Sequence, residues 1–385
     1  MRTSAAVLAV STAATEVSLG ANPGGQLMRH RFGLNYIPSQ NWQFQWNDWK
    51  PESVARDFDS IAEVGADHIR IMLIWPWFQP NPTYVSTAHL DRLEELMRLA
   101  GDRKMDVLAT LYNGWLSGYA FKPPYLEKAD FYCDPMWKPV RELYLSEVGR
   151  RLMIYPNFLG FDLGNEIEDC WHAPTTDGDA WMEGVFKQMR DVAPGHIHVN
   201  GVSHDPWFRD NTFSPEALVS CQDIVAMHCW PEWTGANKFG RFSDVPSIKL
   251  QSGMAALARS YGKAPLKPIW VQEFGLRPNP DVPDFSKWLE SVITSGIEGG
   301  ISWFTWWGSH DIDSRFQFSP EQHTRGLITL DNKIKKHGRM FKQLADNYRG
   351  KLVSIPKAPL PPPPVEHTRE ATWQWLLDWM GWKMK

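Results

Sequence analysis

Two glutamates in this sequence are placed where they could act as a catalytic pair. Glu166 lies in the acid-rich stretch GFDLGNEIEDC (160–170), and Glu273 lies in the apolar run PIWVQEF (268–274). Two carboxylates on a rigid scaffold can break a glycosidic bond when a protonated one donates to the leaving oxygen and an ionised one attacks the anomeric carbon. The two stretches are far apart along the chain, so this chemistry requires a fold that brings them together.

Short apolar runs alternate with amphipathic stretches along most of the chain. The runs predict buried strands at 31–37, 68–75, 105–112, 158–165, 196–202, 223–230, 268–274 and 299–307. Apolar residues at three- and four-residue steps predict helices at 52–64, 89–101, 137–153, 179–192, 247–261 and 284–295. Only the link at 214–221 is too short for a full helix. The pattern predicts an α/β fold, a (β/α)8 TIM barrel over residues 29–350. A doubly wound open sheet is the alternative, but no Gly-x-Gly-x-x-Gly loop follows the first run.

The two ends of the chain lack this alternation. Residues 1–28 are expected to form a flexible segment, and the short apolar stretch Ala5–Val10 is thinner than a secretory signal. This favours a cytoplasmic location over secretion and leaves the compartment open. Residues 351–385 are expected to form a proline-rich linker and a short C-terminal helix that docks through one apolar face. We interpret this tail as an appendage rather than as part of the catalytic unit.

Composition narrows the class of partner. A formal net charge of −4 lacks the positive field that nucleic-acid binding needs, and no apolar run is long enough to span a membrane. The chain has 21 tryptophans, whose flat apolar faces suit the C–H faces of sugar rings, although most are expected in the core. No CxxC pair or HExxH motif is present, so neither a metal nor a cofactor is expected. A carbohydrate partner is therefore predicted, and the oligomeric state is left open.

Polar and aromatic residues that could form a site lie on the predicted strands or directly after them. In chain order they are Arg70, Asn165 with Glu166, His204, His228 with Trp230, Glu273, and Trp303 with Trp306. The carboxyl ends of barrel strands meet at one mouth, where reacting groups gather. Arg70 lies between two isoleucines, where a buried charge needs a partner, and a carboxylate beside it would be held ionised.

These motifs resemble the retaining glycosidases of clan A, most closely the cellulase and mannanase group of glycoside hydrolase family 5. The resemblance rests on GNE at 164–166, QEFG at 272–275, Arg70 and a tryptophan on the eighth strand, and it spans most of residues 31–345. It implies that Glu166 is the general acid/base and Glu273 the nucleophile.

The resemblance also implies roles for the residues around the pair. Asn165 would bind the substrate 2-hydroxyl, Arg70 would keep Glu273 ionised, and His228 would orient the nucleophile side. The match is looser for His204 and for Trp230, which stands where the family usually has tyrosine. For the aromatic platform under the sugar, Trp306 is favoured over Trp303, and Trp115 is expected in a long loop at the mouth.

The predicted activity is that of a retaining β-glycosidase, with β-mannosides placed before β-glucosides. Retention requires the two carboxyl groups to lie roughly 5–5.5 Å apart. Long loops after several strands favour an exo-acting enzyme or one for short oligosaccharides, with an endo-acting β-1,4-mannanase or glucanase as the alternative. A non-catalytic carbohydrate-binding barrel and a metal-dependent barrel hydrolase are the alternatives from other classes. Glu168 and Asp169 are expected to be solvated acids on the loop after Glu166, and contact with a bound sugar is the alternative.

Overall fold

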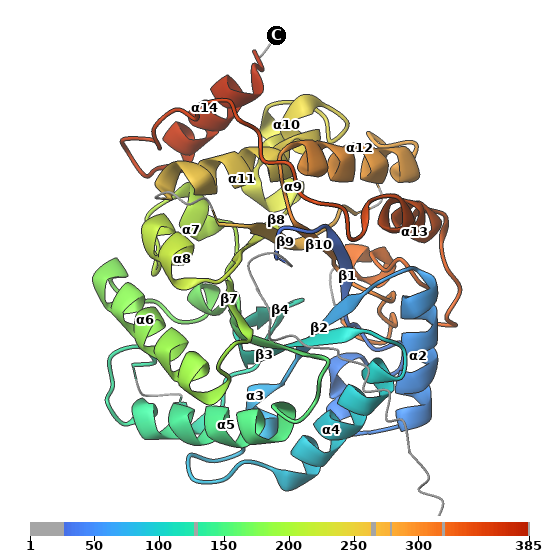
Figure 1. Cartoon of the computed structure of the whole chain (residues 1–385), viewed down its shortest axis with the longest axis vertical. Helices are drawn as coiled ribbons and strands as arrows, with labels where there is room; N and C mark the ends of the chain where they lie inside the picture. Colours follow the sequence, from blue (N-terminus) through green and yellow to red (C-terminus); the bar gives the residue numbers. More distant parts are fainter. Residues whose placement is uncertain (1–26, 127–129, 263–266, 278, 318–319, 384–385) are drawn as a thin grey trace, which may run out of the picture.

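The computed structural model describes residues 27–126, 130–262, 267–277, 279–317 and 320–383. Almost all of the predicted N-terminal segment therefore lies outside the described residues. Eight parallel strands form one sheet in the order β7-β6-β3-β2-β1-β10-β9-β8, with helices around it (Figure 1). This arrangement confirms the predicted (β/α)8 barrel. No helix among the described residues is long and apolar enough to cross a membrane.

The barrel strands agree with the predicted runs to within a few residues. They are β1 Arg31–Asn35, β2 His68–Met72, β3 Asp106–Asn113, β6 Phe158–Asn165, β7 Ile197–Gly201, β8 Val225–Cys229, β9 Ile269–Phe274 and β10 Trp303–Trp306. Nearly every residue in them is buried. The reason is that one face of each strand lines the barrel interior while the other packs against the surrounding helices.

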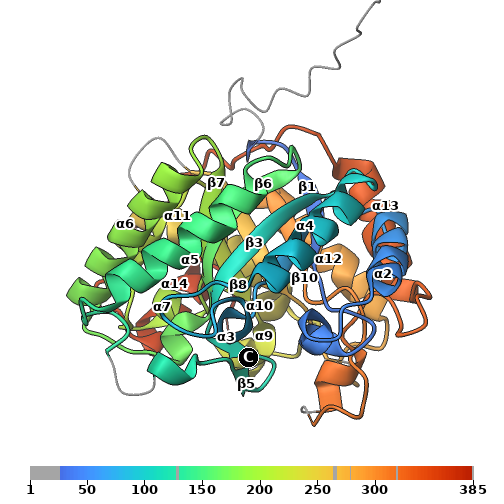
Figure 2. The ribbon, with the colours of Figure 1, turned by 90° about the horizontal axis from the view of Figure 1, so that it is seen from below.

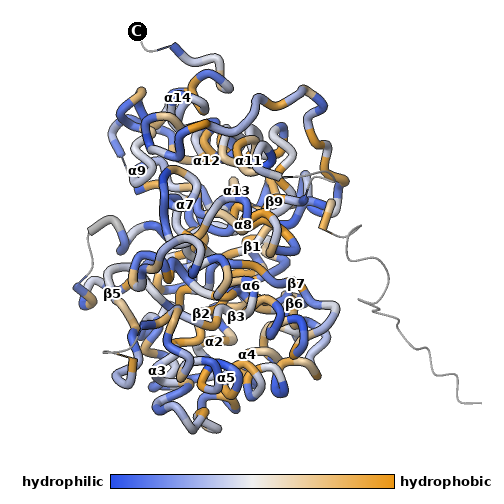
Figure 3. The backbone as a smooth tube through the Cα atoms, turned by 90° about the vertical axis from the view of Figure 1, so that its left-hand side faces the viewer, coloured by the Kyte–Doolittle hydropathy of each residue, from blue (hydrophilic) through white to orange (hydrophobic). Residues whose placement is uncertain are grey.

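The outer layer consists of the predicted helices and several short ones. The longer helices are α2 Pro51–Glu63, α4 Thr87–Gly101, α5 Trp137–Leu152, α6 Thr175–Val192, α8 Pro215–Cys221, α11 Leu250–Tyr261, α12 Phe285–Glu298, α13 Lys336–Tyr348 and α14 Arg369–Met380. Apolar and polar residues alternate along helices such as α4 and α5 (Figure 3), as expected for helices with one face on a sheet. The weak fifth link is the seven-residue α8.

Short elements belong to the loops between strands and helices. They are β4 Trp115–Leu116, β5 Tyr119–Ala120, α3 Trp75–Phe78, α7 Asp205–Phe208, α9 Pro231–Thr234, α10 Val245–Ile248, η1 Trp42–Trp46, η2 Pro124–Leu126, η3 Ile167–Asp169, η4 Ala236–Lys238 and η5 Pro320–Thr324. The β4–β5 hairpin, α3 and α9 lie at one end of the barrel (Figure 2). This is the end to which the strands deliver their carboxyl termini.

The barrel interior has an apolar floor and a polar upper layer. Trp270 and Trp303 pack against each other in the floor, with ring centroids 4.8 Å apart. His68 lies beside both rings, and its Nε2 is 2.8 Å from Oγ1 of Thr305. Arg70 and other buried polar side chains fill the layer above. Because apolar rings fill the floor, the charged groups of the barrel interior lie in the layer next to the mouth.

β7 and β8 are the two ends of the hydrogen-bonded strand order, so a seam runs between them. The buried side chain of Gln222 bridges this seam. Its Oε1 accepts hydrogen bonds from the backbone N–H of Asn200 on β7 (2.9 Å) and of Ala226 on β8 (3.1 Å). Its Nε2 donates to the carbonyl oxygen of Leu218 at 2.9 Å. The side-chain amide of Gln222 thus takes the place of backbone hydrogen bonds between β7 and β8.

The last helix, α14, packs against the outside of the barrel beside α11 (Figure 1). Gly253 of α11 permits the close approach, since a Cβ there would lie 2.8 Å from Cε of Met380. Thr368 caps the amino end of α14 by accepting a hydrogen bond from the N–H of Ala371. The proline-rich segment before α14 is tied to the helix by Trp375, whose indole N–H donates to Pro362 O at 2.8 Å.

We expect Gln222→Met to lower the free energy of unfolding by about 3 kcal/mol, because two buried backbone N–H groups lose their acceptor. Urea denaturation followed by circular dichroism measures the loss. Gln374→Met is the control, since Gln374 is exposed on α14 and its side chain donates to Asp378, one turn further along the same helix. Equal stabilities of the two variants would contradict the bridging role of Gln222.

Candidate active site

Glu166 directly follows β6 and has a left-handed backbone conformation, with φ 47° and ψ 45°. Its N–H donates to the carbonyl oxygen of Gly201 at 2.7 Å. A Cβ at Gly114 would lie 2.5 Å from the Glu166 carbonyl oxygen, so only glycine fits beside this turn. A non-glycine residue in the left-handed backbone conformation, such as Glu166, costs on the order of 1–3 kcal/mol of folding free energy. The surrounding strands hold that strained backbone, and they thereby aim the carboxylate into the mouth.

Glu273, on β9, is anchored by the buried guanidinium of Arg70 on β2. Nη1 of Arg70 lies 2.8 Å from Oε1 of Glu273. Nη2 of Arg70 donates to Oδ1 of Asn165 at 2.8 Å, and both its Nε and Nη2 bond Oδ2 of Asp162. Nη1 also donates to Oδ1 of Asn35 at 3.0 Å. One cation on β2 therefore fixes two carboxylates and two amides from three other strands, β1, β6 and β9.

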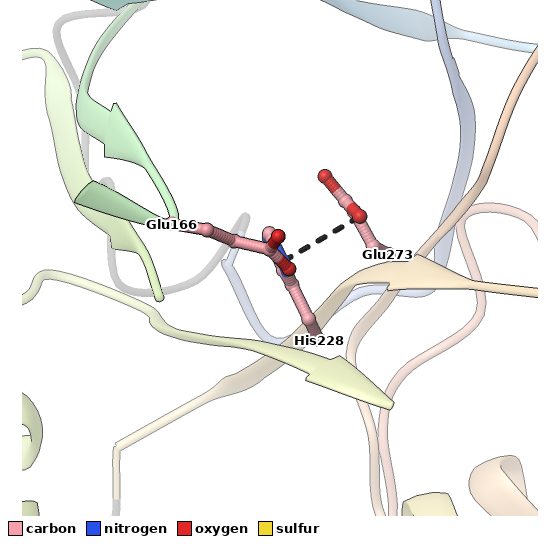
Figure 4. Close-up of side chains that lie close together, drawn as sticks. All are labelled: Glu166, His228 and Glu273. Carbon is pink, nitrogen blue, oxygen red and sulfur yellow. Dashed lines mark hydrogen bonds and ion pairs between the residues drawn. The ribbon is translucent and has the colours of Figure 1, made fainter. Parts of the chain in front are cut away.

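His228 on β8 lies between the two glutamates (Figure 4). Its Nδ1 is 2.8 Å from Oε1 of Glu166 and 3.5 Å from Oε2 of Glu273. Its Nε2 lies 3.3 Å from Oε1 of Gln272. Burial lowers the pKa of His228 to about 4, so the ring is neutral near pH 7. A neutral ring can hold both carboxylates in place without neutralising either one.

The two carboxylates are close neighbours. One oxygen of Glu166 and one of Glu273 lie within 4.8 Å of each other, with Nδ1 or Nε2 of His228 inside the same limit. Inverting glycosidases keep their carboxyl groups roughly 6.5–9.5 Å apart to hold a water molecule, whereas retaining enzymes need about 5–5.5 Å. The close approach of these oxygens favours a retaining pair over an inverting one.

The two carboxyls have different electrostatic surroundings. Burial raises the pKa of Glu166 well above its usual 4.5, and the nearby Asp169 raises it further. Burial also raises the pKa of Glu273, but His228 and Arg70 act in the opposite direction. Arg70 lowers the pKa of Glu273, as expected, but desolvation outweighs it and the net shift is upward. Arg70 still favours the ionised form of Glu273, with which it is in direct contact.

A pocket of about 520 Å³ opens above the pair. It is lined by Trp115, Ser117, Gly118, Asn165, Glu166, Asp169, Ser203, His204, Trp230, Trp233, Glu273, Trp307, Gln317 and Gln322. Trp115 and Trp233 are 44% and 46% exposed, so each presents an open aromatic face. Trp230 is buried and packs against Trp233, with ring centroids 4.7 Å apart. Aromatic walls around two carboxylates form a site suited to a sugar.

The sequence matches no protein-family model and no curated protein, but solved structures match over most of its length. A variant of GH5_18 from Streptomyces cattleya, in complex with Manβ1-4GlcNAc, is 26% identical with a TM-score of 0.83 and 91% of each chain covered. GH5_18 from Bifidobacterium longum subsp. longum ATCC 55813 is 25% identical with a TM-score of 0.84, over 92% of this chain and 90% of that one. The chain is a family 5-like glycoside hydrolase.

The fold is shared with more distant structures as well. An exo-β-1,4-mannosidase from Opitutaceae bacterium strain TAV5 is 23% identical with a TM-score of 0.75, and the match covers 84% of this chain and 61% of that one. At 23% sequence identity, the similarity to this structure shows a common barrel fold and no more.

The prediction for the platform tryptophan is wrong in this hydrolase. Trp303 lies in the barrel floor, and Trp306 is buried against Phe274 with its Nε1 bonded to the carbonyl oxygen of Arg325. Side chains alternate along a strand, so Trp303, Thr305 and Trp307 share the inner face while Trp306 points outward. Of the inward residues, Trp307 lies nearest the mouth and lines the pocket. The alternation was visible in the sequence and would have selected Trp307.

The two acids that follow Glu166 are also not simply solvated. Glu168 is fully buried, and its Oε1 accepts a hydrogen bond from the N–H of Ser203 at 2.6 Å. Asp169 lines the pocket, and burial together with Asp205 raises its pKa to about 6. Asp169 thus takes the alternative position, at the sugar pocket. The burial of Glu168 was not foreseen, because η3, a single turn after Glu166, folds the loop back onto the barrel.

The remaining predicted site residues take positions at the mouth. Asn165 lines the pocket, and its Nδ2 donates to the backbone oxygen of Trp115 at 2.6 Å. His204 also lines the pocket, and burial lowers its pKa to about 4. Arg70 lies beneath the pocket as the support of Glu273.

We expect Glu166→Gln to lower kcat by roughly 10²–10⁴-fold, the contribution of a general acid. The same variant should melt at a higher temperature than the native hydrolase near pH 8. The folded-state pKa of Glu166 is raised, so the native protein loses stability as pH rises through that pKa, whereas glutamine carries no such penalty. Near pH 4 the acid is mostly protonated in both folded and unfolded states, so the gain should vanish. Calorimetry at both pH values measures this difference, and a gain independent of pH would contradict it.

Glu166, His228 and Glu273 are also close enough together to ligate a cation. In the structure these groups already have protein partners, because His228 bonds Glu166 and Arg70 bonds Glu273. We expect dialysis against EDTA to leave the hydrolytic rate unchanged. A loss of activity that zinc or another divalent ion restores would instead support a metal-dependent hydrolase.

Proposed function

We propose that the protein is a retaining exo-β-mannosidase that releases mannose from short β-linked saccharides, with Glu273 as nucleophile and Glu166 as general acid/base. The single observation that carries the mechanism is the spacing of the two carboxylates, with oxygens within 4.8 Å. Carboxylates this close favour direct attack by Glu273 over the water-mediated attack of an inverting enzyme.

In the first step, Glu273 attacks the anomeric carbon and forms a covalent glycosyl ester. The bond from the anomeric carbon to the leaving oxygen breaks, its electron pair goes to that oxygen, and Glu166 supplies the proton. Arg70 supports this division of roles, since of Glu166 and Glu273 it contacts only Glu273, the one that must be ionised. Glu166 lacks such a contact, and its raised pKa suits a proton donor.

In the second step, water takes the place of the departed group. Glu166, now ionised, removes a proton from this water, whose oxygen attacks the anomeric carbon from the side that the leaving group vacated. Glu273 is released as a carboxylate, and Glu166 regains its proton. The product keeps the anomeric configuration of the substrate.

The choice of β-mannoside rests on the similar structures and on the pocket. GH5_18 proteins from two organisms bind Manβ1-4GlcNAc in their solved complexes. A volume of about 520 Å³ lies in the range of pockets that enclose a small ligand rather than a polymer. Manβ1-4GlcNAc is therefore the first substrate to test. An endo-acting enzyme would instead release oligosaccharides from mannan or glucan, and a non-catalytic barrel would bind the disaccharide without cleaving it.

We expect Glu273→Ala to lose hydrolysis of 4-nitrophenyl β-mannoside, because the covalent step has no nucleophile. Added azide should restore cleavage and give the α-mannosyl azide, since azide then displaces the aryl group directly. In Glu166→Ala the nucleophile remains, so azide should give the β-mannosyl azide. Proton NMR of the products distinguishes the anomers.

The control for this pair is Glu183→Ala, which removes an exposed glutamate from α6 and should hydrolyse the substrate like the native enzyme. Full activity of Glu273→Ala, or the same azide anomer from both variants, would reject the assigned roles. Absence of any hydrolysis of β-mannosides and β-glucosides by the native enzyme would reject the proposed function itself.

A further inference from the structure

The amino end of α14 reaches the rim of the active-site pocket through one side chain, Arg369. Its Nη1 lies 3.2 Å from the carbonyl oxygens of Trp233 and of Thr234. Its Nη2 donates to Oδ1 of Asp205 and lies 3.3 Å from Nε2 of His204. His204 and Trp233 both line the pocket. A residue of the C-terminal tail therefore contacts two segments of the pocket wall.

These two segments lie on opposite sides of the barrel seam. His204 follows β7 and Trp233 follows β8, and β7 and β8 are the two strands that end the hydrogen-bonded order of the sheet. Gln222 bridges the seam within the barrel. At the mouth, Arg369 bridges the loops that continue from the same two strands. The relative position of these loops thus depends on the helix that follows the barrel.

The contacts made by Arg369 suit a guanidinium. The carbonyls of Trp233 and Thr234 belong to the last turn of α9, where carbonyl oxygens lack helical partners and accept hydrogen bonds from basic side chains. The planar group can serve these oxygens and the carboxylate of Asp205 together. Its charge is matched by that carboxylate, and 27% of the side chain is exposed. A lysine has a single ammonium and cannot cover all of these acceptors.

Trp373, one turn further along α14, strengthens the same connection. Its Nε1 donates to Thr234 O at 2.8 Å, and its ring packs against Phe208 of α7 with centroids 5.5 Å apart. Oγ1 of Thr372 lies 3.4 Å from the carbonyl oxygen of Phe208. One face of α14 therefore contacts both α7, which follows β7 in the chain, and α9, which follows β8. The helix that seemed an appendage in the sequence is seated on both loops.

His204 belongs to the side of the pocket where Glu166 lies. β7, which precedes His204, pairs with β6, which precedes Glu166. The residue before it on the same loop, Ser203, bonds Glu168 of the turn that follows Glu166. The general acid of a retaining glycosidase stands beside the leaving oxygen, so groups on its side face the leaving-group sugar. Trp233 offers an exposed aromatic face across from His204.

We infer that Arg369 is a positioning residue that makes the C-terminal helix part of the binding site for the leaving-group sugar, by holding His204 and Trp233 at a fixed separation. This inference rests on the proposed function and deepens it. Arg369 itself acts through the two loops and does not enter the chemistry. Loss of its contacts should weaken the binding of the leaving-group sugar and leave the cleaved sugar and the carboxylate pair unaffected.

The decisive variant is Arg369→Met, tested in the full-length chain with Manβ1-4GlcNAc. We expect KM for the disaccharide to rise about tenfold, as small displacements of substrate-positioning groups can produce. With 2,4-dinitrophenyl β-mannoside, hydrolysis of the covalent intermediate limits kcat and the leaving group has already gone, so kcat should keep its native value. Inhibition by free mannose, which occupies only the site of the cleaved sugar, should also be unchanged.

Arg209→Met is the matched control, because Arg209 bonds the other carboxylate oxygen of Asp205 and is 55% exposed. It should leave KM for the disaccharide unchanged. Arg369→Lys keeps the charge beside Asp205 but loses part of the contacts with α9, so its KM should fall between those of the native enzyme and Arg369→Met. Melting temperatures of all three variants verify that they are folded. If Arg369→Met unfolds, Trp373→Phe removes the bond to Thr234 O while keeping an aromatic ring beside Phe208, and it should raise KM in the same direction.

The outcomes separate this inference from the proposed function. A native enzyme that cleaves no β-glycoside overturns the proposed function, whatever the variants do. A native enzyme that cleaves Manβ1-4GlcNAc, with the same KM for Arg369→Met, overturns only the role of Arg369. Equal increases in KM for Arg209→Met and Arg369→Met, or parallel weakening of mannose inhibition, would also overturn it, because a general structural effect would produce them.

Discussion

The buried guanidinium of Arg70 is the interaction on which the rest of the site depends. It lies in the polar layer of the barrel, fully removed from solvent, and it pairs with Asp162 and with Glu273. Removing one partner of a buried ion pair typically costs about 3–5 kcal/mol, because an uncompensated charge is left behind. The barrel must therefore close around this group with all of its partners in place. That requirement sets the position of Glu273 before any substrate arrives.

Two carboxyls of the same type acquire different properties from their neighbours. Burial raises the pKa of both, but only Glu273 contacts a permanent cation. Glu166 has acidic neighbours instead, and after burial Asp169 makes the largest contribution to its raised pKa. His228 stays neutral between them and keeps the pair together without removing the difference. Asymmetry of this kind allows one carboxyl to give a proton while the other attacks carbon.

The pocket wall depends on parts of the chain that are not in the barrel. The β7–β8 seam leaves two loops without a shared strand ladder, and α14 packs across both of them. Arg369 and Trp373 place the C-terminal helix against the loops that carry His204 and Trp233. A helix outside the repeating unit can therefore adjust the site for the leaving group without changing the barrel or the reacting carboxylates.

Sequence patterns alone were sufficient for the barrel and for the meeting of Glu166 and Glu273 at its mouth. Continuous apolar runs buried on both faces mark the strands, and Glu166 and Glu273 follow from their places at strand ends. Predicting the tryptophan at the mouth required knowing which side chains of the eighth strand point into the barrel. In the structure Trp307 lines the pocket, whereas Trp306 points outward. Glu168 and Arg369 could be understood only from the tertiary structure. Their partners, Ser203 and Asp205, lie on a loop that is distant in sequence, and only packing brings these residues together.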